Sequence, residues 1–281
     1  MASDSGCTLS TNELRRQAVR RVILSLRSRL DESFSLGSMA ALAFASRFHF
    51  NRFFHEVTGI PPCQFLYALR LDEAKRLLLM TRLRVADICY EVGYNSLGTF
   101  TRRFRDLVGV SPTGFRSQAR LWSQGRHQSL SSSSVLDPPP PKGASLFGSI
   151  GAPLEFRGLI FIGLFTEPIP QGRPVACTIA DGGAFCITGI PDGTFYLFAL
   201  ALSEPFESST LFYCPEVLRA GGQRIAVVNG AVHGTTYLSL RIPDVADPPI
   251  LVALSPLLRG VHPSSAAALT QRESSQAAHG G

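Results

Sequence analysis

The chain has 281 residues, of which 45% are hydrophobic, and a formal net charge of +6. This length and apolar content suffice for about two domains and exclude a chain without buried cores. The charge is uneven, because residues 1–130 carry 19 Arg and Lys against 10 Asp and Glu, whereas residues 131–281 carry 8 against 11. The local net charges are +9 and −3, so the first half is the part suited to a polyanionic partner.

Cysteines and apolar runs exclude further classes of protein. The six cysteines form no Cys-x-x-Cys or Cys/His pattern, so we expect no zinc site and a reducing compartment, although Cys177 and Cys186 flank a predicted hairpin and could pair. The first 20 residues lack the apolar run behind a basic start that a secretory signal needs, so we expect no such signal. No apolar stretch is long enough to span a membrane. We therefore expect a cytoplasmic protein without a membrane contact or a cofactor.

The first predicted helix begins near residue 10. The segment from Ser10 to Glu13 is typical of a capping box, with Ser10 as the N-cap. An apolar residue then recurs at every fourth position, which predicts one buried helix face: Leu14, Ala18, Val22, Leu26 and Leu30. The arginines between these positions are either a solvated basic face or contacts to DNA phosphates.

Residues 46–115 contain an internal repeat with an offset of 50 positions. Eight pairs of positions carry the same or a similar residue: Ser46 and Ser96, Phe50 and Phe100, Arg52 and Arg102, Phe54 and Phe104, Gly59 and Gly109, Ile60 and Val110, Pro62 and Pro112, Phe65 and Phe115. A fixed offset of this kind predicts a duplicated structural unit.

Each unit is predicted to be two helices joined by a tight turn. In the second unit Gly93 supplies the turn, because glycine accepts a positive φ, and Ser96 caps the following helix. In the first unit Ser46 is the corresponding cap, and the turn before it is one residue shorter. Between the units, residues 65–80 are predicted to form one long helix that would set the spacing of the units.

The pattern of two helix-turn-helix units predicts binding to duplex DNA. The second helix of such a unit fits the major groove and presents its outward side chains to base edges. Two such helices about one DNA turn apart, roughly 34 Å, would read successive major grooves. A single chain could then bind without dimerising.

Residues 30–120 resemble the DNA-binding domain of the AraC/XylS family of bacterial transcription regulators. Three segments carry the resemblance: Phe65-x3-Leu69-Arg70-Leu71-x2-Ala74, Ile88-Cys89-x2-Val92-Gly93-Tyr94-x-Ser96, and Phe100-x3-Phe104-x4-Gly109-x-Ser111-Pro112-x2-Phe115-Arg116. The resemblance implies a sequence-specific, nucleoid-associated transcription regulator that binds double-stranded DNA, contacts RNA polymerase and acts as a monomer or homodimer. We expect no enzymatic activity.

The resemblance also assigns contact residues. Base readers are expected at Phe48, Asn51, Arg52, Leu97, Thr99, Arg102 and Arg103. Contacts to the DNA backbone are expected from Arg47, His49, Ser96, Thr101, Ser111 and Arg116. Asn pairs well with adenine and Arg with guanine, whereas a residue that touches only phosphate positions the protein without specifying sequence.

Three points stay open on this surface. Phe48 could belong partly to the core, and Arg103 could touch phosphate alone. Leu97-Gly98 stands where the family often has polar residues, which predicts a narrower readout by the second helix. The alternative function is therefore a low-specificity DNA-binding interaction scaffold.

The second half of the chain is predicted to be all-β. The double helix-turn-helix domain is expected at residues 10–122, a disordered Ser/Pro-rich linker at 123–144, a β-sandwich at 145–258 and a disordered tail at 259–281, which makes a multidomain α plus β protein. A hairpin turn is expected at Asp181-Gly182-Gly183 and a second turn at Pro191-Asp192-Gly193. The expected strands are Leu159–Phe165, Val175–Ile179, Phe185–Ile187, Phe195–Leu202, Ile225–Val228, Tyr237–Ile242 and Ile250–Leu254.

The sequence of the β-domain contains no recognisable set of catalytic residues. The stretch from Arg157 to Leu197 resembles carboxypeptidase-regulatory-like, transthyretin-type β-sandwich modules, which implies that it senses a small-molecule or protein ligand or contacts a partner. His233 has no acid or nucleophile partner, so a surface or structural role is expected. No cysteine lies in the Pro-Cys-His setting that DNA alkyl transfer needs.

Overall fold

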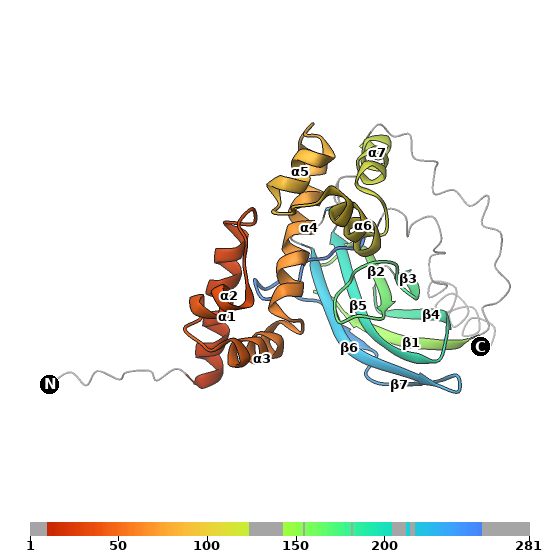
Figure 1. Ribbon diagram of the computed structural model, residues 1–281. Helices are drawn as coiled ribbons and strands as arrows, with labels where there is room; N and C mark the ends of the chain where they lie inside the picture. Colours follow the sequence, from red (N-terminus) through yellow and green to blue (C-terminus); the bar gives the residue numbers. More distant parts are fainter. Residues whose placement is uncertain are drawn as a thin grey trace, which may run out of the picture.

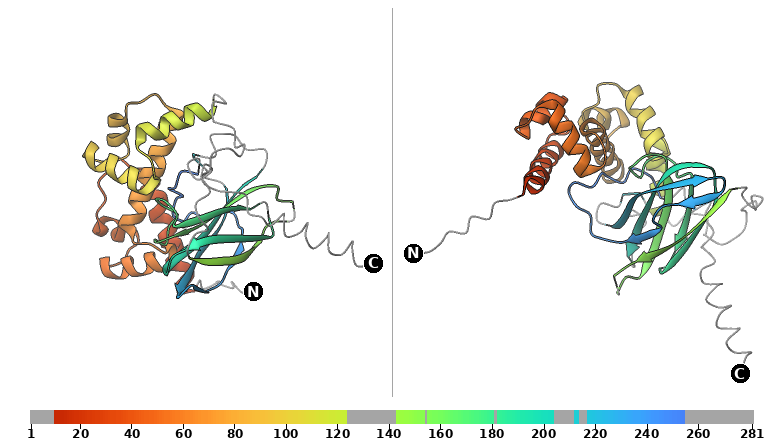
Figure 2. Two further views of the ribbon diagram at one scale, coloured as in Figure 1. Left: turned by 90° about the vertical axis from the view of Figure 1, so that its right-hand side faces the viewer. Right: turned by 90° about the horizontal axis from the view of Figure 1, so that it is seen from below.

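The computed structural model describes residues 10–123, 143–153, 155–180, 182–203, 212–213 and 217–254. Helices and strands are segregated into two domains that lie side by side (Figures 1 and 2). The helices are α1 (Thr11–Arg27), α2 (Leu36–Leu42), α3 (Arg47–Thr58), α4 (Pro62–Met80), α5 (Val85–Glu91), α6 (Leu97–Val108) and α7 (Pro112–Ser123). The strands are β1 (Ala144–Gly151), β2 (Gly158–Phe165), β3 (Ala176–Ala180), β4 (Ala184–Ile190), β5 (Gly193–Ser203), β6 (Leu218–Val228), β7 (Ala231–His233) and β8 (Tyr237–Ser239).

The helix starts confirm the predicted caps. The hydroxyl oxygens of Ser10, Ser46 and Ser96 each accept a hydrogen bond from the backbone N–H three residues later, at 3.2, 3.4 and 3.4 Å. Such bonds satisfy N–H groups that a helix cannot pair internally. The long helix α4 begins at Pro62 rather than Phe65, because proline is well suited to the first helical position.

The predicted face of α1 is wrong at its start. Ala18, Val22 and Leu26 are buried as expected, but Leu14 is 53% exposed. In a helix with 3.6 residues per turn, residues four positions apart are rotated by about 40° relative to each other. A series of residues at this spacing therefore moves off the buried face within a few steps. Val19 and Ile23 complete that face instead.

The two helix-turn-helix units, α2–α3 and α5–α6, lie on either side of α4 (Figure 1). Each is anchored by the same aromatic contact: Phe54 meets Phe65 with ring centroids 5.5 Å apart, and Phe104 meets Phe115 at 5.6 Å, both nearly perpendicular. Edge-to-face pairs of this kind add to the free energy of simple burial. The 50-residue repeat of the sequence is therefore also a repeat of packing.

The β-domain is a sandwich of two sheets within the described residues. One sheet has the strand order β4-β1-β8 and the other β3-β2-β5-β6-β7. β1 and β7 were missed from the sequence, since β1 is broken by Ser and Gly and β7 has three residues. The expected turn at Pro191-Asp192-Gly193 is confirmed, and the Asp192 carboxylate accepts from the N–H groups of Asn229 and Gly230 at 2.9 and 3.0 Å.

The expected hairpin at Asp181-Gly182-Gly183 is wrong. Asp181 lies outside the described residues, but β3 and β4 on its two sides belong to different sheets, so this turn crosses the sandwich. Gly182 and Gly183 both have positive φ, which lets the chain change sheets abruptly. The crossing also separates Cys177 from Cys186, and both are free thiols.

The five-stranded sheet is buried on both faces. Along β5, Leu197, Ala199 and Ala201 pack into the sandwich core. The alternate residues Phe198, Leu200 and Leu202 join a cluster that is continuous with the core of the helical domain. The two domains are thus packed against each other through one hydrophobic core.

The last predicted strand, Ile250–Leu254, does not form. These residues are buried but form no strand, and they lie in the cluster between the sheet and the helices. An apolar run of this length has the same pattern whether it pairs in a sheet or packs as extended chain. Of the predicted linker at 123–144, Ser123 belongs to α7 and Ala144 to β1, whereas residues 124–142 and the predicted tail at 259–281 lie outside the described residues. No described helix is long and apolar enough to cross a membrane.

Candidate nucleic-acid interface

The first recognition helix, α3, presents a row of polar and aromatic side chains to solvent. Arg47, Phe48, His49, Asn51 and Arg52 are all exposed. Phe48 is 84% exposed, which rules out the alternative that it belongs to the core. The opposite face of the helix is fixed by buried Phe50, Phe53 and Phe54.

Arg52 is the one of these side chains with an ion-pair partner. Its Nε lies 3.6 Å from the Glu56 carboxylate, which also lies 3.8 Å from Arg15 of α1. Both Arg52 and Glu56 are more than half exposed, so the pair contributes little to stability. Arg52 can therefore exchange Glu56 for another acceptor at small cost.

The second recognition helix, α6, presents a less polar surface. Leu97, Gly98, Thr99 and Arg102 are exposed, and Phe100 and Phe104 hold the helix to the core. Leu97 is 41% exposed, and neither it nor Gly98 can form a side-chain hydrogen bond. Arg102 is thus the exposed base-reading candidate on α6 with a charged side chain.

Arg103 is placed differently from Arg102. Its guanidinium carbon lies 4.0 Å from the ring centroid of Tyr67 on α4, and it is only partly exposed. Burial acts against the charge, but the nearby Tyr67 and Tyr94 hydroxyl groups favour it and together raise the pKa of Arg103. The contact ties α6 to the linker helix, and no sequence signal pointed to Tyr67 as the partner.

The candidates for backbone contacts fall into two groups. Arg47, His49, Ser96 and Thr101 lie on the first turns of the recognition helices, and all but Thr101 are exposed. Ser111 caps α7 by accepting from the N–H of Gly114 at 3.2 Å. Arg116 is partly buried and its Nε donates to the Leu78 carbonyl at 3.0 Å, so in this structure it holds α7 against α4.

The turn of the first unit contains a residue that the sequence did not single out. Phe44 has φ +52° and is 87% exposed, with the Arg21 guanidinium 5.7 Å from its ring. Counted from Met39 and Ile88, Phe44 corresponds to Gly93, which has φ +81°. The one-residue difference in turn length hides this match at the offset of 50.

A polar cleft of about 670 Å³ lies between α1, the end of α3 and residues 241–247. Three of its four carboxylates have ion-pair partners, since Glu56 pairs with Arg15, Asp244 with Arg20 and Asp247 with Arg241. The fourth, Glu13, accepts a hydrogen bond from the Gln17 amide at 3.4 Å. A second cavity lies on the face of the five-stranded sheet that packs against residues 250–254. Its volume is about 20 Å³, which is room for about one water molecule.

Three of the four described cysteines are poorly suited to act as nucleophiles. Burial raises the pKa of Cys89, Cys177 and Cys186, which disfavours the reactive thiolate. Cys63 is exposed at the start of α4. Cys7 and Cys214 lie outside the described residues.

A comparison with protein-family models matches residues 39–118 to a helix-turn-helix domain. The Transposon Tn10 TetD protein of Escherichia coli is 31% identical over 104 residues, which are 37% of this chain and 75% of that protein. The chain belongs to the AraC/XylS family of transcription regulators. The transthyretin-type resemblance of the β-domain remains a prediction.

Other family members match over the same region. The transcriptional regulator Rob of Salmonella typhimurium is 31% identical over 105 residues, 37% of this chain and 36% of Rob. The transcriptional activator AarP of Providencia stuartii is 26% identical over 98 residues, 35% of this chain and 73% of AarP. The chain thus spans most of TetD and AarP but about a third of Rob.

Among solved structures, the DNA-binding domain of the transcriptional factor AdpA, in complex with a target DNA, is 31% identical. The match covers 37% of this chain and 93% of that chain, with a TM-score of 0.36. An AraC-type regulator from Chromobacterium violaceum is 23% identical and covers 37% and 92%, also with a TM-score of 0.36.

Proposed function

We propose that this protein binds duplex DNA in a sequence-specific manner and regulates transcription there, with α3 and α6 reading successive major grooves. The observation that carries this proposal is the exposure of Arg52 and Arg102 at matched positions of two capped helices of equal length. With the β-domain packed in place, Asn51, Arg52, Thr99 and Arg102 remain exposed. The helical half also holds the excess of basic residues that attraction to phosphate requires.

Within this proposal the two helices carry different shares of the readout. On α3, Asn51 and Arg52 offer hydrogen bonds to adenine and guanine, and Phe48 offers an apolar contact to thymine methyl groups. On α6, Arg102 is the main reader, with Leu97 and Thr99 beside it. We assign Arg103 and Arg116 to positioning, since both are engaged within the protein, and Arg47, His49, Ser96, Thr101 and Ser111 to the DNA backbone.

The first test is selection of duplex DNA from a random library by the full-length protein, followed by sequencing. The expected result is a motif with two half-sites about one helical turn apart. Arg102→Ala and Asn51→Ala should each lower affinity for that motif by about 1–3 kcal/mol and relax preference at one base pair. Arg224→Ala is a matched control for Arg102→Ala, because it removes one exposed charge from β6, and it should leave the motif unchanged.

A low-specificity interaction scaffold is the second candidate, favoured by the exposed Leu97-Gly98 pair on α6. It predicts equal affinity for selected and random DNA, with a steep dependence on salt concentration. An unchanged footprint and affinity for both Arg102→Ala and Asn51→Ala would contradict sequence reading and support the scaffold. A contact with RNA polymerase, and ligand sensing by the β-domain, for which the polar cleft is the candidate place, remain proposals.

A further inference from the structure

Residues 241–254, here called the brace segment, run from the β-domain across the helical domain. The segment follows β8 and contacts three helices in turn: α1, α4 and α6. In Figure 1 its dark blue trace passes α4 between the two halves of the helical domain. The brace segment therefore contacts the linker helix and the second helix-turn-helix unit directly, and it is connected to the first unit through α1, which packs on α3.

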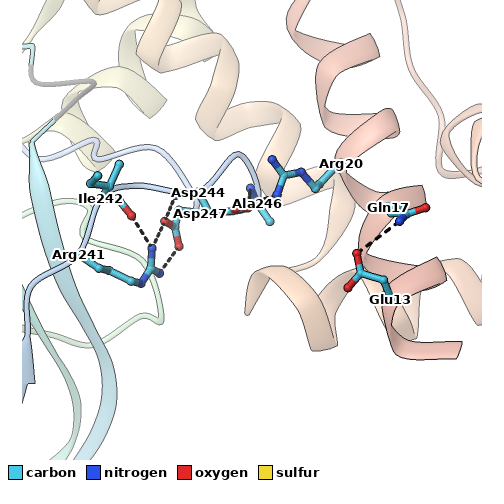
Figure 3. A network of polar contacts seen from close by, with 8 residues as sticks. All are labelled: Glu13, Gln17, Arg20, Arg241, Ile242, Asp244, Ala246 and Asp247. Carbon is cyan, nitrogen blue, oxygen red and sulfur yellow. Dashed lines mark hydrogen bonds and ion pairs between the residues drawn. The ribbon is translucent and has the colours of Figure 1, made fainter. Parts of the chain in front are cut away.

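The first contact is with α1, which packs on α3. Arg20 Nη1 lies 2.9 Å from Asp244 Oδ2 (Figure 3). The loop that presents Asp244 is closed by Arg241, whose two guanidinium N–H groups each donate to the Asp247 carboxylate at 2.7 Å. The Asp244 N–H donates to the same carboxylate at 2.7 Å, so the geometry of the loop is fixed.

The second contact is buried. Lys75 of α4 has a side chain that is 1% exposed, and its Nζ donates to the Ile250 carbonyl at 2.7 Å. The carboxylate of Asp72 lies 3.9 Å from the same Nζ. A buried ammonium is strongly unfavourable without partners, so the position of Ile250 is defined by Lys75.

The third contact is at the end of the second recognition helix. The N–H of Ala253 donates to the Val108 carbonyl at 3.1 Å. The β2–β3 connection lies beside the brace segment and supports it, because the Pro170 carbonyl accepts from the N–H groups of Leu251 and Val252. From this connection the N–H of Gly172 donates to the Leu107 carbonyl at 2.6 Å. These carbonyls belong to the last turn of α6, where a helix has no internal donors left. Gly172 has φ +67°, and a Cβ there would lie 3.1 Å from the Asp106 carbonyl oxygen, so the close approach favours glycine.

We infer that the brace segment holds the two recognition helices at one separation and thereby sets the spacing of the half-sites that this protein accepts. Without it, α4 is the main element that joins the units, since α2–α3 pack on one part of α4 and α5 on another. A single helix resists bending less than a helix with a second connection. This inference rests on the proposed reading of two half-sites, and Lys75, Gly172 and Ala253 act in it as positioning residues.

The first test measures the distance between the recognition helices without DNA. Spin labels are attached through non-canonical residues at the exposed positions His55 and Arg105 of the full chain, and the distance distribution is recorded by pulsed electron resonance. We expect a narrow distribution for the unchanged protein, about twofold broader in Lys75→Met, since opening of a packed region shows as conformational spread. Arg224→Met, which removes a charge from the exposed surface of β6, should leave it narrow.

The second test measures binding to the selected motif with its half-sites moved apart by one or two base pairs. The unchanged protein should lose about tenfold in affinity per altered spacing, and Lys75→Met about threefold or less. The affinity of Lys75→Met for a single half-site should match that of the unchanged protein. Gly172→Ala, which presses on α6 without uncovering a charge, should shift the preferred spacing and serves as the deciding variant if Lys75→Met fails to fold by circular dichroism.

Unchanged distance distributions in both Lys75→Met and Gly172→Ala would overturn the brace, whatever the DNA result. Spacing profiles identical to that of the unchanged protein would also overturn it. If the unchanged protein selects no motif at all, the proposed function fails, and the distance measurement still decides on the brace.

Discussion

The two helix-turn-helix units share one sequence pattern, but they are held in place by different contacts. The helix α3 is free on its outer face, and its unit reaches the β-domain through one exposed ion pair from α1. The helix α6 is fixed at its middle and at its C-terminal end: Arg103 stacks on Tyr67, and the last carbonyls accept from the β-domain. The unit with the richer reading surface is thus the less restrained one.

This difference shows how one duplicated unit can divide two tasks. A base-reading helix gains from exposed donors and acceptors, whereas a helix that defines position gains from contacts within the protein. The turns follow the same division, since the second unit has a glycine packed against buried groups and the first has an exposed phenylalanine in a comparable conformation.

The largest expected effect concerns the turn of the second unit. A Cβ at Gly93 would lie 2.3 Å from the Leu30 carbonyl oxygen and 2.6 Å from the Arg70 guanidinium, at φ +81°. Gly93→Ala should therefore lower the free energy of unfolding by about 2–4 kcal/mol, measured by urea denaturation.

Gly98→Ala is the matched control for Gly93→Ala. Gly98 lies on the exposed face of α6, with its nearest atom, Ser96 Oγ, 3.9 Å from a built Cβ. Its replacement should raise the stability by about 1 kcal/mol, because alanine is the better helix former. Equal effects of the two substitutions on the free energy of unfolding would contradict the conclusion that only Gly93 lies where a Cβ cannot fit.

A smaller effect of opposite sign is expected at the turn of the first unit. Phe44 adopts φ +52°, which is unfavourable for a side chain with a Cβ. Phe44→Gly should raise the free energy of unfolding by about 0.5–1 kcal/mol, whereas Phe44→Ala, which loses the ring without relieving the backbone, should not. Destabilisation of equal size by both substitutions would show that the contact of the ring with Arg21 stabilises the protein by more than the backbone strain destabilises it. The turns of the two units would then contribute to stability in the same way.

The smallest effect tests how the first unit is tied to the β-domain. Burial works against the charge of Asp247, but hydrogen bonds from Arg241 and the Asp244 N–H outweigh it and hold its pKa below the usual value. A carboxyl with a lowered folded pKa adds stability above its unfolded pKa, near 4, and that stability is lost as the pH falls further.

Asp247→Asn should therefore cost below about 1 kcal/mol at pH 6, and its difference from the unchanged protein should shrink between about pH 4 and pH 3. Thermal unfolding across this range measures the difference. A constant difference would mean that the loop is held by its backbone alone and that the ion pairs of Figure 3 add nothing to the restraint of the first unit.

Local signals in the sequence predicted most of the helical domain. Caps such as Ser46 and Ser96 and the turn at Gly93 depend on a few neighbouring residues, so their chemistry can be read directly. The repeat then supplied the long-range arrangement. Phe44 was missed because no local rule favours phenylalanine at positive φ.

Contacts between distant segments could not be predicted in this way. Tyr67 precedes Arg103 by 36 positions, and Lys75 meets Ile250 across 175. Nothing in either local sequence marks the partner. The apolar run at residues 250–254 was expected to form a strand, but it packs against helices instead, and this depends on the packing of the two domains.

The order of the brace segment in the chain has a consequence for synthesis. The helical domain is complete at Ser123, whereas the segment that spans it ends 131 residues later, at Leu254. At usual bacterial translation speeds, on the order of ten seconds pass between the two events. A helical domain that folded during that interval would have both recognition helices in place, while Lys75 and the apolar surface that the sheet covers in the finished protein would still be exposed.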